Sequence, residues 1–459
     1  MATSALLHSQ PTTKNAATEY ANSVNPQWVR LLALLGMDTE YVRCSGAMLE
    51  TTDGRQVLDC LSGYCVYNTG HNHPYILDAL KQELDRCGPT MLQSHIPGLA
   101  GELAGRLCHL AGGQLQKVFF CSSGSEGVES AIKFAHARTG RSGLLSCQGS
   151  FHGLTTGALS LMGECFWKAN FGPLLPEVAT VPFNDLPALE KQLATRKFAA
   201  FFVEPVQGEG GIRLPDADYL QQAQDLCHKY GSLFVADEVQ TGLYRTGKFL
   251  ASHHYGVGPD MVILAKALSG GLVPVAAVLM TEDIYDAVYG SLKRAILHAS
   301  TFSENALSMR AGLATLDVLA AENLGGRSLH TGEALRQQLQ DALQDFEMVE
   351  EVRGLGLFNG IVFRAPRQLS LRVAFESCKA VHPGLFGQML VRRLFNQHDL
   401  LTQICGNDFM VLKVAPPLVI GAAERDRIVA AITETASAVH SSGTFWKDAL
   451  EIARRAVNL

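Results

Sequence analysis

The chain has 459 residues, of which 47% are hydrophobic and 18% charged, a composition typical of a compact globular protein. Its 38 basic residues against 44 acidic ones give a net charge of −6, which argues against nucleic acid or an anionic membrane as partner. No apolar stretch is long enough to span a bilayer, and no secretory signal is recognisable. The 11 cysteines fit no metal-binding pattern, so we expect no metal and reduced thiols in the cytoplasm.

The N-terminal part divides into two segments. Residues 1–22 are rich in Ala, Ser, Thr and Gln without an apolar period, which predicts a mobile tail. A helix is expected to begin at Asn25-Pro26, because Trp28 and Leu31 follow at helical spacing. We assign residues 23–75 to the N-terminal segment of a small domain.

Residues 76–325 alternate short apolar runs with helical patterns, which predicts a large α/β domain. The runs show no polar–apolar alternation, as expected for strands buried on both faces of a mainly parallel sheet. The expected strands are residues 118–121, 144–147, 198–203, 233–236, 261–265 and 275–280, with helices at 126–136 and 219–230.

After residue 325 amphipathic helices mix with short strands, which predicts a smaller α+β domain over residues 326–440. The expected helices are residues 332–346, 383–396 and 425–439, and the expected strands are residues 360–363 and 410–414. We expect residues 441–459 to add a C-terminal helix.

Chemically useful side chains fall just after four of the predicted strands, where ligands bind in open α/β sheets. Residues 121–126, Cys-Ser-Ser-Gly-Ser-Glu, join a strand to a helix whose first N–H groups suit a phosphate; alone, this motif is better explained as a helix cap. At Asp237-Glu238, a buried carboxylate would need a partner such as a protonated ring nitrogen, and an exposed loop acid is an equal alternative.

The third and fourth groups follow the strands at 261–265 and 198–203. Lys266 directly follows a buried strand, where a desolvated amine suits imine formation; the alternative is a lysine that reaches the surface. We favour chemistry, because the small residues after Lys266 leave room around the amine. The loop at residues 204–211 carries two acids and three glycines and is either a glycine-rich turn or a ligand-binding loop, without the GxGxxG spacing.

A phosphate cradle, a carboxylate and an amine together describe a site for pyridoxal phosphate (PLP). The phosphate would bind at the start of the helix, the carboxylate would keep the pyridine nitrogen protonated, and the amine would bind the aldehyde. A protonated ring accepts the electrons of a substrate carbanion, which is the basis of PLP chemistry.

The same motifs, in this order, resemble the class III (ω-amino-acid:oxo-acid) aminotransferases of PLP fold type I, and among them the putrescine and ornithine enzymes. The resemblance runs from about residue 40 to about residue 437. It rests on motifs at residues 58–64, 70–74, 123–129, 151–153, 204–211, 237–242, 266, 298–302 and 415–418. It implies a mainly parallel seven-stranded sheet sandwiched by helices, a smaller α+β domain, and a homodimer whose subunits share their sites.

The resemblance also implies roles for single residues. Lys266 would bind the cofactor as an imine and transfer a proton, and Asp237 would pair with the ring nitrogen. The other cofactor-binding residues would be Gly124 and Ser125 at the phosphate, Phe151 and Val239 on the two ring faces, Gln240 at the phenolic oxygen, and Thr301 at the phosphate of the neighbouring subunit. His152 is expected to touch the site without acting as an acid or base.

At the substrate end the chain departs from the family pattern in two places. Tyr64 would line the pocket, and Glu209 matches a gate glutamate that pairs with an arginine when ω-amines bind. That arginine is Lys413 here, so either Lys413 binds the α-carboxylate less selectively or the acceptor differs. Leu154 replaces the arginine that holds the α-carboxylate in ornithine-type enzymes. We therefore expect an apolar or uncharged substrate end, as in a diamine, a long-chain amine, or the corresponding aldehyde.

These observations predict a PLP-dependent aminotransferase that moves an amino group between an amine or ω-amino donor and an oxo acid, aldehyde or ketone. It would work by a ping-pong mechanism through pyridoxamine phosphate. An aminomutase, racemase or decarboxylase would use the same core residues and stays open as an alternative. A scaffold protein without catalysis is disfavoured, because Lys266, Asp237 and Gln240 are all intact.

Residues 441–459 extend beyond the family's usual end. Phe445, Trp446, Leu450, Ile452 and Val457 would lie on one helical face. We expect this face to pack on the protein's own dimer rather than to bind another partner.

Overall fold

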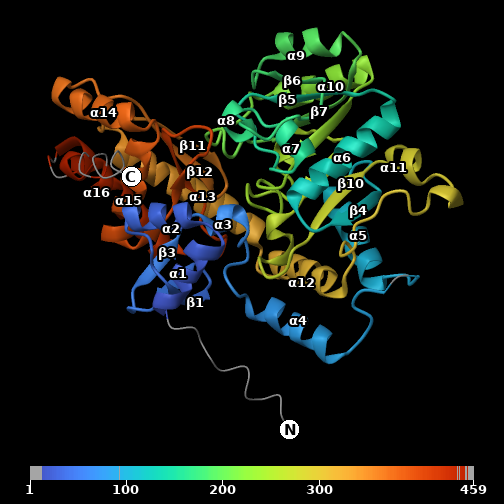
Figure 1. Cartoon of the computed structure of the whole chain (residues 1–459), viewed down its shortest axis with the longest axis horizontal. Helices are drawn as coiled ribbons and strands as arrows, with labels where there is room; N and C mark the ends of the chain where they lie inside the picture. Colours follow the sequence, from blue (N-terminus) through green and yellow to red (C-terminus); the bar gives the residue numbers. More distant parts are fainter. Residues whose placement is uncertain (1–12, 93, 442, 444, 450–451, 453–459) are drawn as a thin grey trace.

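The computed structural model describes residues 13–92, 94–441, 443, 445–449 and 452. Figure 1 shows a large α/β part on one side and a smaller part on the other, and the smaller part combines segments from both ends of the chain. Within the described residues, no helix has the length and apolar character needed to cross a membrane.

A seven-stranded sheet lies at the centre of the large part, in the order β4-β10-β9-β8-β7-β5-β6. Strands β9, β8, β7, β5 and β6 are parallel, and β10 is antiparallel to both of its neighbours. The bounds are Lys117–Cys121 (β4), Gly143–Cys147 (β5), Val178–Val181 (β6), Phe198–Val203 (β7), Leu233–Asp237 (β8), Met261–Leu264 (β9) and Ala276–Met280 (β10). The predicted mainly parallel sheet is confirmed.

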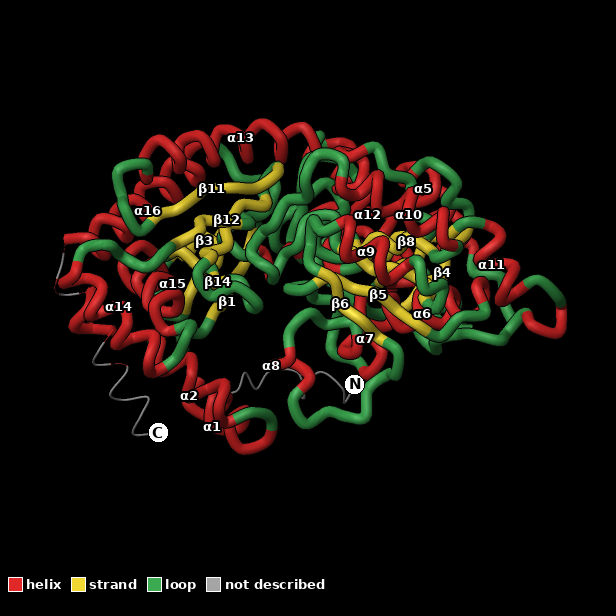
Figure 2. Tube along the Cα trace, turned by 90° about the horizontal axis from the view of Figure 1, so that it is seen from above, coloured by secondary structure: helices red, strands yellow, loops and turns green. Residues whose placement is uncertain are grey.

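Helices cover both faces of this sheet, and neighbouring residues of one strand pack in opposite hydrophobic layers. Ala277 packs in the layer that contains α5 and α12, and its neighbour Val278 packs in the layer that contains α6. Figure 2 shows the strands between these helices. The helices of this part are Pro74–Asp85 (α4), Gly98–Ala111 (α5), Gly124–Thr139 (α6), Thr156–Ser160 (α7), Cys165–Lys168 (α8), Leu186–Leu193 (α9), Tyr219–Tyr230 (α10), Glu282–Tyr289 (α11) and Ala306–Ala321 (α12). Short 3-10 turns lie at Ala251–Tyr255 (η1), Lys266–Ser269 (η2) and Leu292–Arg294 (η3).

The smaller part contains two four-stranded sheets, ordered β1-β2-β3-β13 and β11-β12-β15-β14. Their strands are Tyr41–Ser45 (β1), Met48–Thr51 (β2), Gln56–Asp59 (β3), Val349–Leu355 (β11), Phe358–Phe363 (β12), Leu400–Leu401 (β13), Gln403–Ile404 (β14) and Val411–Val414 (β15). Strand β13 pairs in parallel with β3, and Arg55 Nε donates to Asp399 Oδ1 at 2.7 Å. These contacts join the strands near the N-terminus to the C-terminal part of the chain.

The helices of the smaller part are Thr13–Ser23 (α1), Pro26–Leu35 (α2), Ser62–Cys65 (α3), Leu324–Leu343 (α13), Leu369–Val381 (α14), Leu385–His398 (α15) and Ala422–Ser441 (α16). Of the expected tail at residues 1–22, residues 1–12 lie outside the described residues. The rest differs from a tail without regular structure, because α1 forms and packs against α2. Its three alanines favour a helix even without an apolar period.

The extra C-terminal segment is described at residues 441, 443, 445–449 and 452, which are helical. Phe445, Trp446 and Ile452 are buried in the core of their own chain, and Trp446 stacks on Phe386 with ring centroids 6.0 Å apart. This part of the expected apolar face therefore packs within the subunit rather than across a dimer. Leu450 and Val457, the other two members of that face, lie outside the described residues.

Candidate active site

Asp237 and Lys266 leave the large sheet at the same edge. Strands β8 and β9 pair in parallel with Asp237 opposite Ile263, and Lys266 follows two residues after the end of β9. The carboxyl ends of parallel strands form the ligand-binding edge of an open α/β sheet. The carboxylate and the amine therefore face one region, as the sequence predicted.

Lys266 is held in an unusual backbone conformation. Its φ is +48°, a left-handed value that costs a lysine energy and that the surrounding structure must enforce. Burial lowers the pKa of its amine, and the charge of Lys413 adds to that lowering, while Cys65, Glu209 and Asp237 oppose it. A lysine with a lowered pKa has more of its amine in the neutral, nucleophilic form.

Asp237 is buried and shares a hydrogen bond with a histidine that the sequence analysis underrated. His152 Nδ1 lies 2.7 Å from Asp237 Oδ2, and Val239 N donates to Asp237 Oδ1 at 3.1 Å. Burial works to lower the pKa of His152, but the hydrogen bond and charge of Asp237 outweigh it and raise that pKa. His152 is therefore a direct hydrogen-bonding partner of the Asp237 carboxylate, rather than a residue that only touches the site.

Glu204, at the end of β7, is a second buried acid beside this pair. Its Oε1 accepts from Phe151 N at 2.8 Å and its Oε2 accepts from Gly208 N at 3.0 Å. Burial raises its pKa to about 7, with Asp237 adding to the rise and His152 opposing it. Glu204 thereby fixes the backbone of Phe151. Its position directly after a predicted strand is the sequence signal that marks Glu204 as a residue of this sheet edge.

The start of α6 is shaped to receive an anion. Ser123 caps the helix by accepting from Glu126 N at 3.2 Å, and the first helical hydrogen bond runs from Gly127 N to Ser123 O. The N–H groups of Gly124 and Ser125 precede that bond and remain for a ligand. A methyl group on Gly124 would come within 2.9 Å of Val239 Cγ1, so only glycine keeps this space open.

The remaining predicted cofactor residues surround the same space. Gln240 is buried, and its Nε2 lies 3.4 Å from Glu209 Oε1. Val239 lies beside Gly124 at the start of α6. Phe151 meets Trp167 edge-on, with ring centroids 5.5 Å apart. An amine with a lowered pKa, a histidine-paired carboxylate and an open helix start fit the aldehyde, ring nitrogen and phosphate of PLP.

The three predicted substrate residues meet one another beside Gln240. Lys413, on β15, is fully buried and forms an ion pair with Glu209 Oε1, and its Nζ lies 5.0 Å from the ring centroid of Tyr64. Burial works to lower the pKa of Lys413, but Glu209 raises it above its ordinary value. Glu209 Oε2 also accepts from Gly406 N at 2.8 Å. Both carboxylate oxygens of Glu209 therefore already have a partner, Lys413 at Oε1 and Gly406 N at Oε2.

Leu154 and Thr301 stand apart from these contacts. Leu154 is 54% exposed, and its backbone N lies 3.4 Å from Ser125 Oγ. Because its side chain is apolar, it offers no charge to a substrate near the phosphate end. Thr301 lies in an exposed loop before α12. Within the part of the chain that the structure describes, no interaction joins Thr301 to Lys266 or Asp237.

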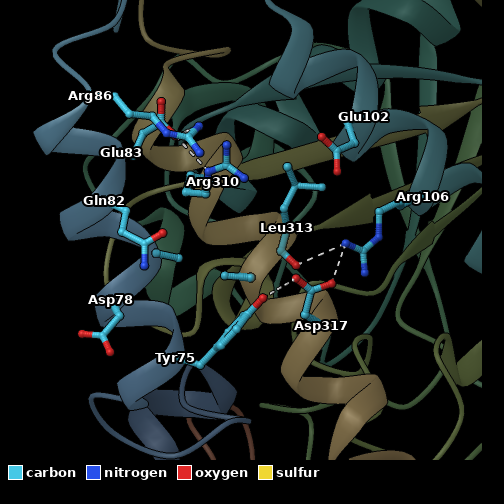
Figure 3. A pocket seen from close by; sticks show the side chains of 12 residues that line it. Tyr75, Asp78, Gln82, Glu83, Arg86, Glu102, Arg106, Arg310, Leu313 and Asp317 are labelled. Carbon is cyan, nitrogen blue, oxygen red and sulfur yellow. Dashed lines mark hydrogen bonds and ion pairs between the residues drawn. The ribbon is translucent and has the colours of Figure 1, made fainter.

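Figure 3 shows a cavity of about 280 Å³ that lies elsewhere, between α4, α5 and α12. Its charged side chains neutralise one another: Arg106 pairs with Asp317 at 2.7 Å, and Arg310 pairs with Glu83 at 2.9 Å. Tyr75 donates to Asp317 at 3.1 Å. The cavity contains none of the residues at the sheet edge, and we do not place the chemistry there.

Known proteins match this chain along most of its length. Aminotransferase PigE from a Serratia species is 36% identical in an alignment that covers 93% of this chain but only 54% of that protein, so the chain spans about half of it. Putrescine aminotransferase from Pectobacterium atrosepticum is 36% identical over 82% of this chain and 78% of its own length. The ornithine aminotransferase of Toxoplasma gondii superposes with a TM-score of 0.81 at 28% identity, covering 94% of this chain and 96% of that structure.

The model of the family "Aminotransferase class-III", whose members depend on PLP, matches residues 36–436. These residues contain the sheet edge, the start of α6 and the Lys413–Glu209 pair. The chain therefore belongs to the class III aminotransferase family.

Proposed function

We propose that this chain is an aminotransferase that uses PLP bound to Lys266 to move amino groups between an amine and a carbonyl compound. The observation that carries this proposal is the convergence of Lys266, Asp237 and the start of α6 at one edge of the sheet. Each group matches one functional part of the cofactor. The fold supplies all three from secondary-structure ends, where their positions are fixed.

The bound cofactor would supply an electron-accepting ring that stabilises a carbanion on the substrate. Lys266 would bind the cofactor through its Nζ and, when that amine is free, would hold and move a proton there as a general acid and base. Asp237, held by His152, would keep the ring nitrogen protonated. Phe151 and Val239 would hold the ring between them, and Gln240 would donate to its phenolic oxygen.

The substrate end favours molecules without an α-carboxylate near Leu154. Leu154 offers no cation, and the charge of Lys413 is already neutralised by Glu209. An acceptor with a carboxylate must displace Glu209 from Lys413, whereas an amine or aldehyde with an apolar chain leaves the pair intact. We therefore assign simple amines, diamines or long-chain amines, and the matching aldehydes, as the preferred substrates.

We further infer that the protein works as a homodimer with Thr301 reaching the phosphate of the neighbouring subunit's cofactor. Ile96, Leu292, Ile296 and Phe302 are between 62% and 97% exposed in the single chain. Apolar side chains so exposed on the segments around Thr301 are typical of an interface. Their burial by a second copy would bring Thr301 to the partner's site.

A reducing compartment such as the cytoplasm suits the cysteines. All 11 are free thiols, and seven of them are buried. Burial raises the pKa of Cys121, Cys147 and Cys405 to about 12, so these thiols are weakly nucleophilic. A fold that relies on buried thiols without disulfides is typical of a cytoplasmic protein.

The experiment that tests the function is a half-reaction followed by absorbance. PLP-loaded protein is mixed with putrescine, ornithine, glutamate or a long-chain amine, and the visible band of bound PLP is watched. Conversion to the spectrum of pyridoxamine phosphate with the simple amines, and slower conversion with ornithine, is the expected result. A protein that uses ornithine well and ignores simple amines would overturn the substrate proposal.

Two other outcomes would overturn the reaction itself. A band that never converts with any amine would favour the aminomutase or racemase alternative. Absence of any visible band after PLP is supplied would contradict the role of Lys266.

A further inference from the structure

A loop of the smaller part reaches across to the large part beside the site. This loop joins β14 to β15, and its Asn407 makes three side-chain hydrogen bonds to the large part. Asn407 Oδ1 accepts from Trp167 Nε1 at 2.6 Å, and Asn407 Nδ2 donates to Gly149 O at 3.0 Å and to Ser150 O at 3.2 Å. All the hydrogen-bonding groups of this side chain's amide are thus directed at one region.

The groups that Asn407 holds are the supports of Phe151. Gly149 and Ser150 directly precede Phe151 in the chain, and Trp167 meets the Phe151 ring edge-on at 5.5 Å. Trp167 belongs to the short helix α8, which has no hydrogen-bonded side-chain cap and whose Phe166 is 77% exposed. A four-residue helix cannot fix an indole ring by itself. The hydrogen bond to Asn407 is one of the tertiary contacts that hold Trp167, beside its ring contacts with Phe151 and Phe166.

The same loop also holds Glu209. Gly406 N donates to Glu209 Oε2 at 2.8 Å, and Asn407 N donates to the backbone oxygen of Glu209 at 2.9 Å. A methyl group on Gly406 would lie 3.1 Å from Glu209 Oε2 and 3.4 Å from Trp167 Cζ2. The indole ring and the gate carboxylate therefore flank one glycine, and the loop connects them.

We propose that Asn407 is a positioning residue that sets substrate specificity by fixing Trp167 as an apolar wall of the site. This inference rests on the proposed function. Asn407 ties that wall, and the backbone before Phe151, to the loop that holds Glu209. A substrate that leaves the Lys413–Glu209 pair intact keeps the wall in place for its apolar chain. A carboxylate that displaces Glu209 removes one of the loop's anchors.

The test compares Asn407→Ala with Asn407→Asp, Trp167→Phe and a matched control. Asn407→Asp keeps the acceptor for Trp167 but loses the two donated bonds, and Trp167→Phe keeps the ring contact but loses the N–H. Asn396→Ala is the control, because Asn396 Nδ2 also donates to two backbone oxygens, Leu35 O at 3.0 Å and Arg392 O at 2.9 Å, away from the site.

Two quantities are measured on the full chain. The first is PLP affinity, from the quenching of tryptophan emission as apoprotein is titrated with PLP. The second is the ratio of KM values for a long-chain amine and a short amine, with kcat measured for both. Asn407→Ala should weaken PLP binding about 5-fold and raise the KM ratio about 5- to 10-fold, with kcat changed less than the ratio. Asn407→Asp should weaken PLP binding with a smaller change in the KM ratio.

Trp167→Phe should raise the KM ratio. Adding Asn407→Ala to it should raise the ratio little further, because both substitutions break the same hydrogen bond, from Trp167 Nε1 to Asn407 Oδ1. If Asn407→Ala matches Asn396→Ala in PLP affinity and in the KM ratio, the inference is overturned while the aminotransferase assignment stands. If the wild-type protein transfers no amino group, the proposed function fails, and the PLP titration still decides whether Asn407 positions the site.

Discussion

The two ends of the site are built in different ways. At the cofactor end, Asp237, Lys266 and the Gly124–Ser125 pair stand at the ends of β8, β9 and the start of α6, each fixed by regular hydrogen bonding. At the substrate end, Lys413 and Glu209 meet from segments 204 residues apart, and a loop holds Glu209. Regular secondary structure therefore fixes the positions of the side chains at the cofactor end. At the substrate end, a substitution at a single residue of a loop or strand can change the arrangement of the side chains.

This difference assigns different consequences to substitutions at the two ends. Changes at the cofactor end should remove catalysis and leave the fold intact, because each side chain does chemistry on a rigid frame. Changes at the substrate end should alter stability and substrate preference together, because the charged pair there is buried. The predictions below separate these two behaviours.

The largest effect is expected for Lys266→Ala. Loss of both the covalent attachment and the proton transfer should lower kcat by about 10⁴-fold. The unfolding midpoint should change little, because the variant removes a buried amine and leaves the left-handed backbone at this position as it is. Steady-state assays and thermal unfolding measure both quantities. Lys117→Ala, a partly exposed lysine on β4, serves as the control and should keep full activity.

Lys413→Met tests the substrate end. It leaves the Glu209 carboxylate buried without its cation, so the free energy of unfolding should fall by about 3–5 kcal/mol. Adding Glu209→Gln should restore most of that loss. The exposed pair of Lys229 and Glu190, 2.8 Å apart, provides the matched control, and Lys229→Met should have a much smaller effect in the same urea titration. Equal losses for the two lysines would contradict a buried gate pair.

Asp237→Asn compares two neighbouring carboxylates. It removes the charge opposite the ring nitrogen and should lower kcat/KM by about 10²- to 10³-fold. Glu238→Gln is the control: Glu238 accepts from Ala251 N at 2.9 Å and Ser252 N at 2.8 Å, so it should affect the unfolding midpoint rather than kcat/KM. The reverse assignment would follow if Glu238→Gln abolished activity and Asp237→Asn did not.

The smallest effect concerns Glu204 and pH. The pKa of Glu204 is about 7 in the folded protein against an ordinary 4.5, so between these values the folded protein keeps a proton that the unfolded chain releases. Its contribution to stability is therefore lost as pH rises from 4.5 to 7 and is constant above. Between pH 5 and pH 7, the free energy of unfolding measured by urea titration should fall by about 2 kcal/mol more in the wild type than in Glu204→Gln. Identical pH slopes would show that Glu204 is already ionised at pH 5.

The sequence was enough to bring Asp237 and Lys266 to one edge of the sheet, because both residues follow strand ends. Lys266 and Asp237 come directly after apolar runs, and parallel pairing then brings them together without further information. The edge strand β6, in which only Val181 is buried, was missed. His152 was underrated, because only the fold shows its Nδ1 next to Asp237.

The substrate end was less predictable for a physical reason. Lys413 and Glu209 were identified singly, but their ion pair depends on how β15 approaches the loop at residues 204–211. Asn407 lies in a loop and Trp167 in a helix of four residues, and neither segment is long enough for a periodic pattern to mark a functional side chain. Contacts between such segments arise from tertiary packing, which local sequence patterns do not encode.

The central claim is that Lys266 is the residue that binds the cofactor. Protein loaded with PLP is reduced with borohydride, digested, and its peptides are analysed by mass spectrometry. The account predicts a reduced phosphopyridoxyl group on Lys266, and none on Lys413 or on any peptide of the Lys266→Ala variant. The label on another lysine, with Lys266 unmodified, would contradict the assignment of the active site.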